Sequence, residues 1–354
     1  MSRQLEEELL VIVLGVDADE NDTVCLTVKV PSSAAQQQKE EDGYLLYSAK
    51  GRGFADALAM LRAAAPRQLN FSQVREIIFG IGAARQADFS LLLSQIDAIP
   101  RFRCSAAVIV CREEAREFVE ALKPDLGVRL SRYADTTLSN SAGKGFTPDT
   151  DLCEALRDLG LGFEDPLLIL GAVGGEADGS PVNEENVLDA LPGALPWQGA
   201  GKIELFGAAA TDGVRVSGFL TGYEMALIHL MEGGASSLTV RQEADVPLHV
   251  TALHPAKLFV DVSVRPIRLT AALTFEVHYP PGHAPDAAAL QKTLAADLDR
   301  MLAHLQALRC DGAGFGNAAA SQFLTVQAWE ALGWREAYAR AERQIILTVI
   351  CREG

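Results

Sequence analysis

The residues that most resemble a phosphate-binding loop are the glycines of GAGFGNAAAS: Gly312, Gly314 and Gly316. Glycine loops that bind phosphate follow a strand and open a helix, so that backbone N–H groups point at the phosphate. Here the run follows a long predicted helix instead. A second candidate, SAGKGF around Lys144, lacks the loop length and the hydroxyl residue that a Walker motif requires after its lysine. We therefore expect no nucleotide and no other cofactor.

Histidines could form a metal site, because four of the six fall within a short stretch of the chain: His249, His254, His278 and His283. Their spacing argues against this, since His249 and His254 differ in strand parity. No cysteine or carboxylate joins them at a known ligand spacing. We expect surface or loop histidines and no metal.

Nucleophilic and acid–base chemistry also lacks a pattern. No serine lies in a Gly-x-Ser-x-Gly elbow, and the acidic residues are spread over predicted helix faces rather than paired at strand ends. The sequence therefore predicts no catalytic residue and a protein that is not an enzyme.

The cysteines are scattered without CxxC spacing, and several lie inside apolar or strand-like runs. A disulfide framework is typical of shorter chains with more cysteine. We expect small buried thiols. The six positions are Cys25, Cys104, Cys111, Cys153, Cys310 and Cys351.

Length and charge narrow the class of protein. A chain of 354 residues, 49% of them hydrophobic, can bury more than one core. Its formal net charge of -16 disfavours nucleic acid and anionic lipid as partners of the average surface. The apolar run at 9–16 is too short for a secretory signal and follows three glutamates, so it predicts a strand.

The first half of the chain alternates between strand and helix patterns. Two β-rich runs joined by a polar turn open the chain and predict an antiparallel hairpin. A polar excursion follows at 32–43. Strand-like runs at 44–48, 76–81 and 106–111 then alternate with helical patterns, which predicts an α/β domain over 1–175.

The second half changes character after a polar, glycine-rich linker at 172–201. Two strand-like runs around Asp212-Gly213 predict a hairpin, and a helix over 223–231 ends at Gly233-Gly234. This hairpin and helix form a predicted small middle domain, 176–238.

Beyond residue 238 long alternating strands precede an amphipathic helix of about 20 residues. We predict a C-terminal α+β domain over 239–354, a largely antiparallel sheet covered by this helix. The whole chain is therefore mixed α/β, in the α+β class, with three domains in series.

Three blocks of the sequence resemble the Ger(x)C family of germinant receptor C subunits. The first runs from LGVDADEN through SAKGRGFADALAMLRAAAPRQLNFSQVREIIFG. The second, FGAAATDGVRVSGFLTGYEMALIHLMEGG, places the family's glycine and glutamate on Gly218 and Glu224. The third, DGAGFGNAAASQFLTVQAWEALGW, resembles an Asp-x-x-Gly-Phe-Gly motif followed by two tryptophans. Its positions are Asp311, Gly314, Phe315, Gly316, Trp329 and Trp334.

This resemblance implies a function and a location. The chain would be a non-catalytic C subunit of a spore nutrient germinant receptor, working alongside two multi-spanning membrane subunits, A and B. The family's members are lipoproteins on the outer leaflet of the spore inner membrane. This chain begins Met-Ser-Arg-Gln, so we expect the leader and its lipid-modified cysteine to be absent from it; the alternative is an unlipidated relative of the family. A lipid anchor suits an acidic surface, since acyl chains need no basic residues.

The matched residues also have structural interpretations. The glycines of the third block could let the backbone turn after the long helix, the tryptophans could close a core, and Glu224 could favour a helix dipole or meet a partner as an exposed carboxylate. An alternative function is a secreted α/β enzyme or small-molecule-binding protein that uses an interdomain cleft.

Overall fold

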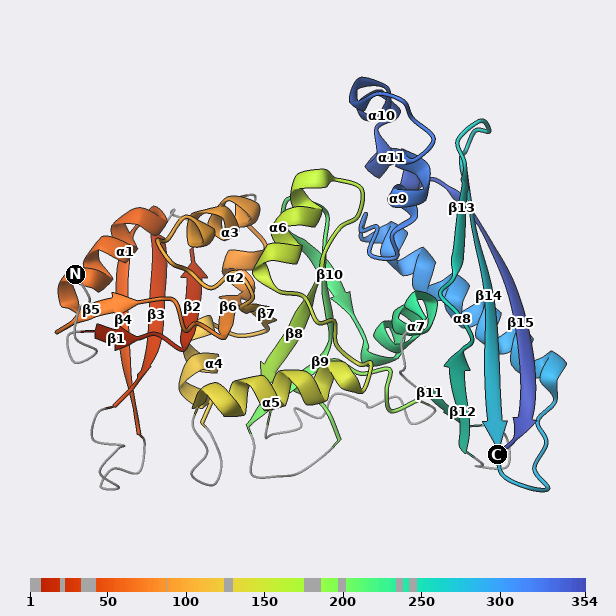
Figure 1. Cartoon of the computed structure of the whole chain (residues 1–354), viewed down its shortest axis with the longest axis horizontal. Helices are drawn as coiled ribbons and strands as arrows, with labels where there is room; N and C mark the ends of the chain where they lie inside the picture. The colour runs from red at the N-terminus through yellow and green to blue at the C-terminus, as the bar shows by residue number, and fades with distance from the viewer. Residues whose placement is uncertain are drawn as a thin grey trace.

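The computed structural model describes residues 8–19, 23–32, 43–86, 88–123, 130–174, 186–196, 202–233, 238–241 and 247–354. Over these residues the chain forms two large sheets that stand side by side (Figure 1). A small parallel pair, β1 (Glu8–Leu10) with β5 (Gln68–Asn70), lies at the end of the first sheet that is remote from the second.

The first sheet has eight strands in the order β10-β9-β8-β7-β6-β2-β3-β4. Its four central strands are parallel, and antiparallel strands flank them on both sides. The predicted opening hairpin is confirmed as the antiparallel pair of β2 and β3. The strands are β2 (Val13–Ala18), β3 (Thr23–Pro31), β4 (Tyr44–Arg52), β6 (Glu76–Gly80), β7 (Ala107–Cys111), β8 (Leu167–Val173), β9 (Ile203–Thr211) and β10 (Val216–Leu220).

Helices cover both faces of this sheet, as the apolar content of its central strands requires. In β7, Val108 and Val110 belong to one core and Ile109 and Cys111 to the other. The first core receives α1 (Gly53–Ala64), α3 (Phe89–Asp97) and α6 (Leu152–Leu161), with the short α2 (Ile81–Ala84) beside them. The second core receives α4 (Ala115–Ala121) and α5 (Leu130–Gly143). The predicted α/β character of this region is confirmed.

The second sheet is the predicted α+β layer. Its strands are β11 (Leu238–Arg241), β12 (Pro247–Ala252), β13 (Lys257–Asp261), β14 (Arg268–Tyr279) and β15 (Glu342–Glu353). The pairings of β11 to β14 are antiparallel, whereas β15 runs parallel to β14. The long helix α8 (Ala287–Ala307) buries its predicted leucine stripe against the alternate, buried residues of β14.

The strands β9 and β10 and the helix α7 (Gly222–Glu232) connect the two layers. The β9–β10 pair is hydrogen bonded to β8, and its alternate residues serve different cores: Ala209 packs in the first, Ala208 and Ala210 in the core of the second sheet. Helix α7 packs in the core of the second sheet too. The division into domains at 1–175, 176–238 and 239–354 stays a prediction.

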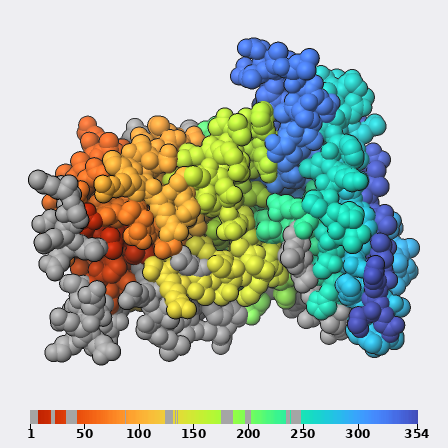
Figure 2. Space-filling view, in the orientation of Figure 1, coloured from red at the N-terminus to blue at the C-terminus, as the bar shows by residue number. Residues whose placement is uncertain are grey.

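The three short helices α9 (Phe315–Ala320), α10 (Val326–Leu332) and α11 (Trp334–Ala339) rise beside the upper end of β13 in Figure 1. In the space-filling view, the yellow-green surface around α6 meets the blue surface of these helices (Figure 2). The third block of sequence therefore makes one of the contacts between the two layers.

One expectation about the cysteines is wrong. Cys104 and Cys153 form a disulfide that joins the segment before β7 to the first turn of α6, with their Cα atoms 5.3 Å apart. The two residues are 49 positions apart in the sequence and meet because β7 lies beside the start of α6. Cys111 and Cys310 are buried thiols, as expected, whereas Cys25 and Cys351 are half-buried.

Most of the predicted polar excursion at 32–43 and much of the linker at 172–201 lie outside the described residues. No helix among the residues that the structure describes has the length and apolar character needed to cross a bilayer.

Candidate functional site

Asp311 is the centre of the junction between the two layers. It follows the end of α8 and is only 1% exposed. Its backbone binds the segment before β8 in both directions: the Asp311 N–H donates to Asp165 Oδ2 at 3.0 Å, and the Asp165 N–H donates to the Asp311 carbonyl at 3.3 Å. These hydrogen bonds join parts of the chain that are 146 residues apart.

The Asp311 carboxylate accepts hydrogen bonds from three N–H donors. Oδ1 accepts from the backbone of Phe315 at 3.0 Å, and Oδ2 accepts from the backbone of Gly316 at 2.6 Å. The indole Nε1 of Trp334 donates to Oδ2 at 3.1 Å. A buried carboxylate needs such donors because desolvation penalises its charge.

Burial nevertheless dominates the acidity of this group. It raises the pKa of Asp311 to about 7, although the two backbone donors oppose the rise. The neighbouring Asp165 carboxyl adds to it by charge repulsion. Burial also raises the pKa of Asp165, against the lowering effect of the Arg335 guanidinium.

The glycines of the third block are needed for this geometry. Gly314 precedes α9 with a φ of 79°, a left-handed conformation that favours glycine. At Gly316 a Cβ atom would lie 2.0 Å from the carbonyl oxygen of Phe163 and 2.7 Å from Trp334 Nε1. The run follows a helix, as predicted, and its N–H groups bind the chain's own carboxylate.

The aromatic residues of the block close the junction. Phe315 is fully buried in the core of the second sheet, and Trp334 is 6% exposed. The half-buried Trp329 packs on Trp334 with ring centroids 5.6 Å apart and on Phe163 at 5.5 Å. The expectation that the tryptophans close a core is therefore met by both rings.

Two charged residues that the sequence analysis missed complete this cluster. Arg335 Nη2 donates to Asp165 Oδ1 at 2.8 Å, and the Arg335 guanidinium also lies against Gly213 in the β9–β10 turn. Asp165 is 4% exposed. The only sequence signal for Arg335 is its position directly after Trp334, and Asp165 carries no signal because its partners are distant in sequence.

The second block makes another contact between the same layers. Glu224 is in the first turn of α7, where its side chain and that of Thr221 form a capping box. Its Oε1 also lies 2.7 Å from Nδ1 of His304 on α8, and its side chain is only 14% exposed. The expectation of an exposed Glu224 carboxylate is therefore wrong. Gly218 in β10 allows Leu308 to approach, since a Cβ there would lie 2.4 Å from a Leu308 methyl group.

The sequence-predicted positions therefore gather where the first sheet meets the C-terminal layer. Asp311, Gly316 and Trp334 share hydrogen bonds or contacts, and Gly314, Phe315 and Trp329 surround them. Gly218 and Glu224 lie on a separate contact to α8. The donors and acceptors around Asp311 are directed at one another, which suits a rigid connection between two layers better than a reaction.

A cavity of about 260 Å³ opens beside this junction. Its lining includes Pro148, Met225, His229 and several carboxylates: Asp149, Glu154, Asp158, Glu164, Asp165 and Glu232. Burial is the main cause that raises the pKa of Glu164, and the nearby Asp158 adds to the rise. The negative lining disfavours phosphate and suits a small cation.

Histidine and carboxylate side chains are also possible metal ligands. His249 and His278 face one another across β12 and β14, 
but within the described parts of the chain no group of three or more His, Cys, Asp or Glu residues could hold a metal ion.

Two known proteins are similar to this chain. Mannose-1-phosphate guanylyltransferase ManC of Salmonella typhimurium is 28% identical over 123 residues, which is 34% of this chain. The chain spans about a quarter of that protein's length (24%). The crystal structure of the GerBC protein matches 96% of both chains with a TM-score of 0.49 and 13% identity.

A family model matches nearly half of the chain. Residues 2–171 match the model described as the spore germination protein N-terminal domain. The match includes the first of the three blocks that resemble the Ger(x)C family, and it spans the strands and helices of the first sheet up to β8. Residues 2–171 therefore belong to the family of spore germination protein N-terminal domains.

Proposed function

We propose that this chain is the non-catalytic C subunit of a nutrient germinant receptor and that it works with the A and B membrane subunits. The match of residues 2–171 to the spore germination model is the observation that carries this proposal. In this role the buried junction around Asp311 holds the two layers in one orientation, so that a displacement of one layer is passed to the other.

The proposal includes a location on the outer leaflet of the spore inner membrane, through an N-terminal lipid anchor. The Cys104–Cys153 disulfide supports an extracytoplasmic site, because disulfides persist outside the reducing cytosol. The acidic net charge of -16 supports anchoring by a lipid rather than by a broad basic surface.

Gene deletion tests the receptor role. Spores that lack the gene should no longer respond to one nutrient while non-nutrient triggers still work. Re-expression of the wild-type chain should restore the response. Re-expression of the Gly316→Ala variant, in which the added Cβ collides with the Phe163 carbonyl, should restore it poorly even where immunoblots detect the variant. Unchanged nutrient germination after deletion would refute the proposal.

The membrane partners are tested by isolation from spores. A tagged copy of this chain should co-purify from detergent-solubilised inner membranes with multi-spanning subunits encoded beside it. The tagged native precursor should also carry a lipid on a cysteine that precedes β1, detectable by mass spectrometry. Recovery of the chain from the soluble spore fraction, without those subunits, would contradict the proposed location and partners.

A second candidate function is small-molecule binding at the acidic cavity beside the junction. The cavity of about 260 Å³ is large enough for a small cation, and its carboxylates supply the matching charge. Addition of small organic ammonium compounds to the purified chain should then raise its melting temperature. A Glu164→Gln variant should respond less than wild type, and an unchanged melting temperature for the wild-type chain excludes this function.

A further inference from the structure

A second, larger cavity lies at the opposite end of the first sheet, beside β1 and β5. It is an open depression of about 1260 Å³ with a predominantly polar lining. Three arginines contribute to that lining: Arg62 in the last turn of α1, Arg67 just before β5, and Arg101 in the turn that follows α3. No residue of the junction takes part in it.

These guanidinium groups have no carboxylate partner within the described part of the chain. This is unexpected in a protein with 47 acidic and 31 basic side chains, where Arg335 and Arg343, for example, both pair with aspartates. One carboxylate, that of Glu8, lines the depression, and it accepts a hydrogen bond from the Asn70 amide at 2.6 Å. The lining therefore keeps a local positive charge on an acidic protein.

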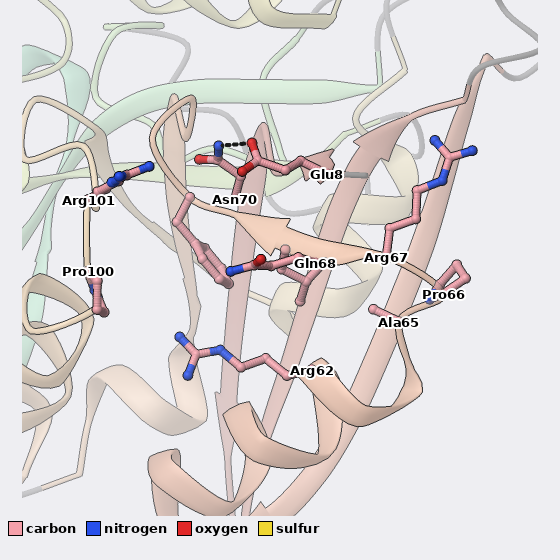
Figure 3. A pocket seen from close by; sticks show the side chains of 11 residues that line it. Glu8, Arg62, Ala65, Pro66, Arg67, Gln68, Asn70, Pro100 and Arg101 are labelled. Carbon is pink, nitrogen blue, oxygen red and sulfur yellow. Dashed lines mark hydrogen bonds between the residues drawn. The ribbon is translucent and has the colours of Figure 1, made fainter. Parts of the chain in front are cut away.

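The arginines reach the depression from separate elements. In Figure 3, Arg62 rises from α1 and Arg101 extends from the opposite side, with the Gln68 amide between them. Arg67 lies farther along, on the other side of Gln68. Below these polar groups the wall contains Leu69 and Phe71, which are buried. Such a wall lowers the local dielectric and strengthens the attraction between a guanidinium and an anion.

Helix stability explains only part of this arrangement. A cation in the last turn of a helix is favoured by the helix dipole, and this accounts for Arg62. It does not account for Arg101, whose φ of 63° is a left-handed conformation that costs a non-glycine residue free energy. Glycine would adopt this turn without strain, so the backbone conformation does not explain why an arginine occupies this position.

We propose that this depression binds a phosphate group that is attached to a larger organic moiety, with Arg62 and Arg101 as its principal ligands. Guanidinium groups on two sides can share the several oxygens of a tetrahedral phosphate, and arginine binds phosphate in a bidentate manner. The volume of about 1260 Å³ exceeds what inorganic phosphate would fill. The Gln68 amide can add a neutral donor.

The headgroup of an anionic phospholipid and a soluble phosphate ester share this chemistry. The lipid source rests on the proposed function, because an anchor that precedes β1 would bring this end of the first sheet to the membrane. The binding itself does not depend on the receptor role. Normal germination of spores whose receptor lacks the arginines of this pocket would show that the receptor role does not depend on phosphate binding.

The test compares the wild-type chain with an Arg62→Ala/Arg101→Ala variant. A Lys257→Ala/Arg340→Ala variant is the matched control, since it removes the same charge at exposed positions of the C-terminal layer. Binding is measured by co-sedimentation with phosphatidylcholine vesicles, with and without phosphatidylglycerol, and by calorimetry with glycerol 3-phosphate. Because all four side chains are exposed, both variants should keep the wild-type urea midpoint.

We expect the pocket variant to bind at least about tenfold more weakly than wild type, and the control variant to change by less than about twofold. Binding to phosphatidylglycerol vesicles alone would identify the lipid source, and binding of glycerol 3-phosphate the soluble one. Absence of both, or equal losses in the two variants, would overturn the proposal.

Discussion

The hydrogen bonds to Asp311 allow one interaction at the junction to be measured by itself. In an Asp311→Ala variant, the Phe315 and Gly316 backbone N–H groups and the Trp334 indole lose their acceptor. Each buried donor left unsatisfied costs about 1–3 kcal/mol, which gives roughly 3–9 kcal/mol for the three.

Removal of the Asp311 carboxyl also removes the free-energy cost of burying its charge. Its pKa rises from 3.8 to about 7, and each unit corresponds to 1.36 kcal/mol, so the relief is at most about 4 kcal/mol near neutral pH. These two effects oppose one another in the single variant. A double-mutant cycle with Trp334→Phe separates them, because phenylalanine keeps an aromatic ring but has no N–H to leave unsatisfied.

We expect Asp311→Ala to be less destabilising in the Trp334→Phe background by about 1–3 kcal/mol, the cost of one buried donor. Urea denaturation followed by far-UV circular dichroism measures the four free energies of unfolding. Trp329→Phe is the control, since this ring packs on Trp334 and makes no hydrogen bond to Asp311. A coupling of Trp334 no larger than that of Trp329 would refute the importance of the indole hydrogen bond.

Three further perturbations test other parts of the structure. Gly316→Ala should lower the free energy of unfolding by about 3 kcal/mol or more in urea denaturation, because the new Cβ meets a backbone oxygen that cannot move alone. Replacement of Cys104 and Cys153 by serine should lower the free energy of unfolding by about 4 kcal/mol, because the unfolded chain gains the entropy of an open loop of 49 residues. An unchanged urea midpoint would contradict this. The Glu224 hydrogen bond raises the pKa of His304, so the pair stabilises the fold at low pH and this contribution is lost as pH rises through the raised pKa. Glu224→Gln, which retains the capping box, should therefore destabilise the protein more at pH 6 than at pH 9, as measured by thermal unfolding; equal losses at both pH values would exclude the ion pair.

The local patterns of the sequence determined most elements of the fold. Period-two alternation in β14 and the leucine stripe of α8 identify two surfaces that bury each other, because each element has one apolar side. The Asp212-Gly213 turn and the Gly233 helix end were also recognisable, since positive φ angles favour few residue types. The resemblance of the three blocks to one family is also carried by the sequence alone.

The tertiary structure decided which distant residues meet. Hydrophobic periodicity cannot reveal that β9 and β10 continue the first sheet, because strand pairing depends on contacts between separate segments. The Cys104–Cys153 disulfide was missed for the same reason. Its cysteines are 49 residues apart, and their spacing resembles that of unpaired thiols.

The same distinction holds for the functional residues. The sequence by itself determined that Asp311, Gly316 and Trp334 belong to one motif, because they are close along the chain. Only the tertiary structure added Asp165, whose carboxylate binds the Asp311 backbone across 146 positions. It alone also gathered the arginines at the far end of the first sheet, because the charge around a side chain depends on which segments fold beside it.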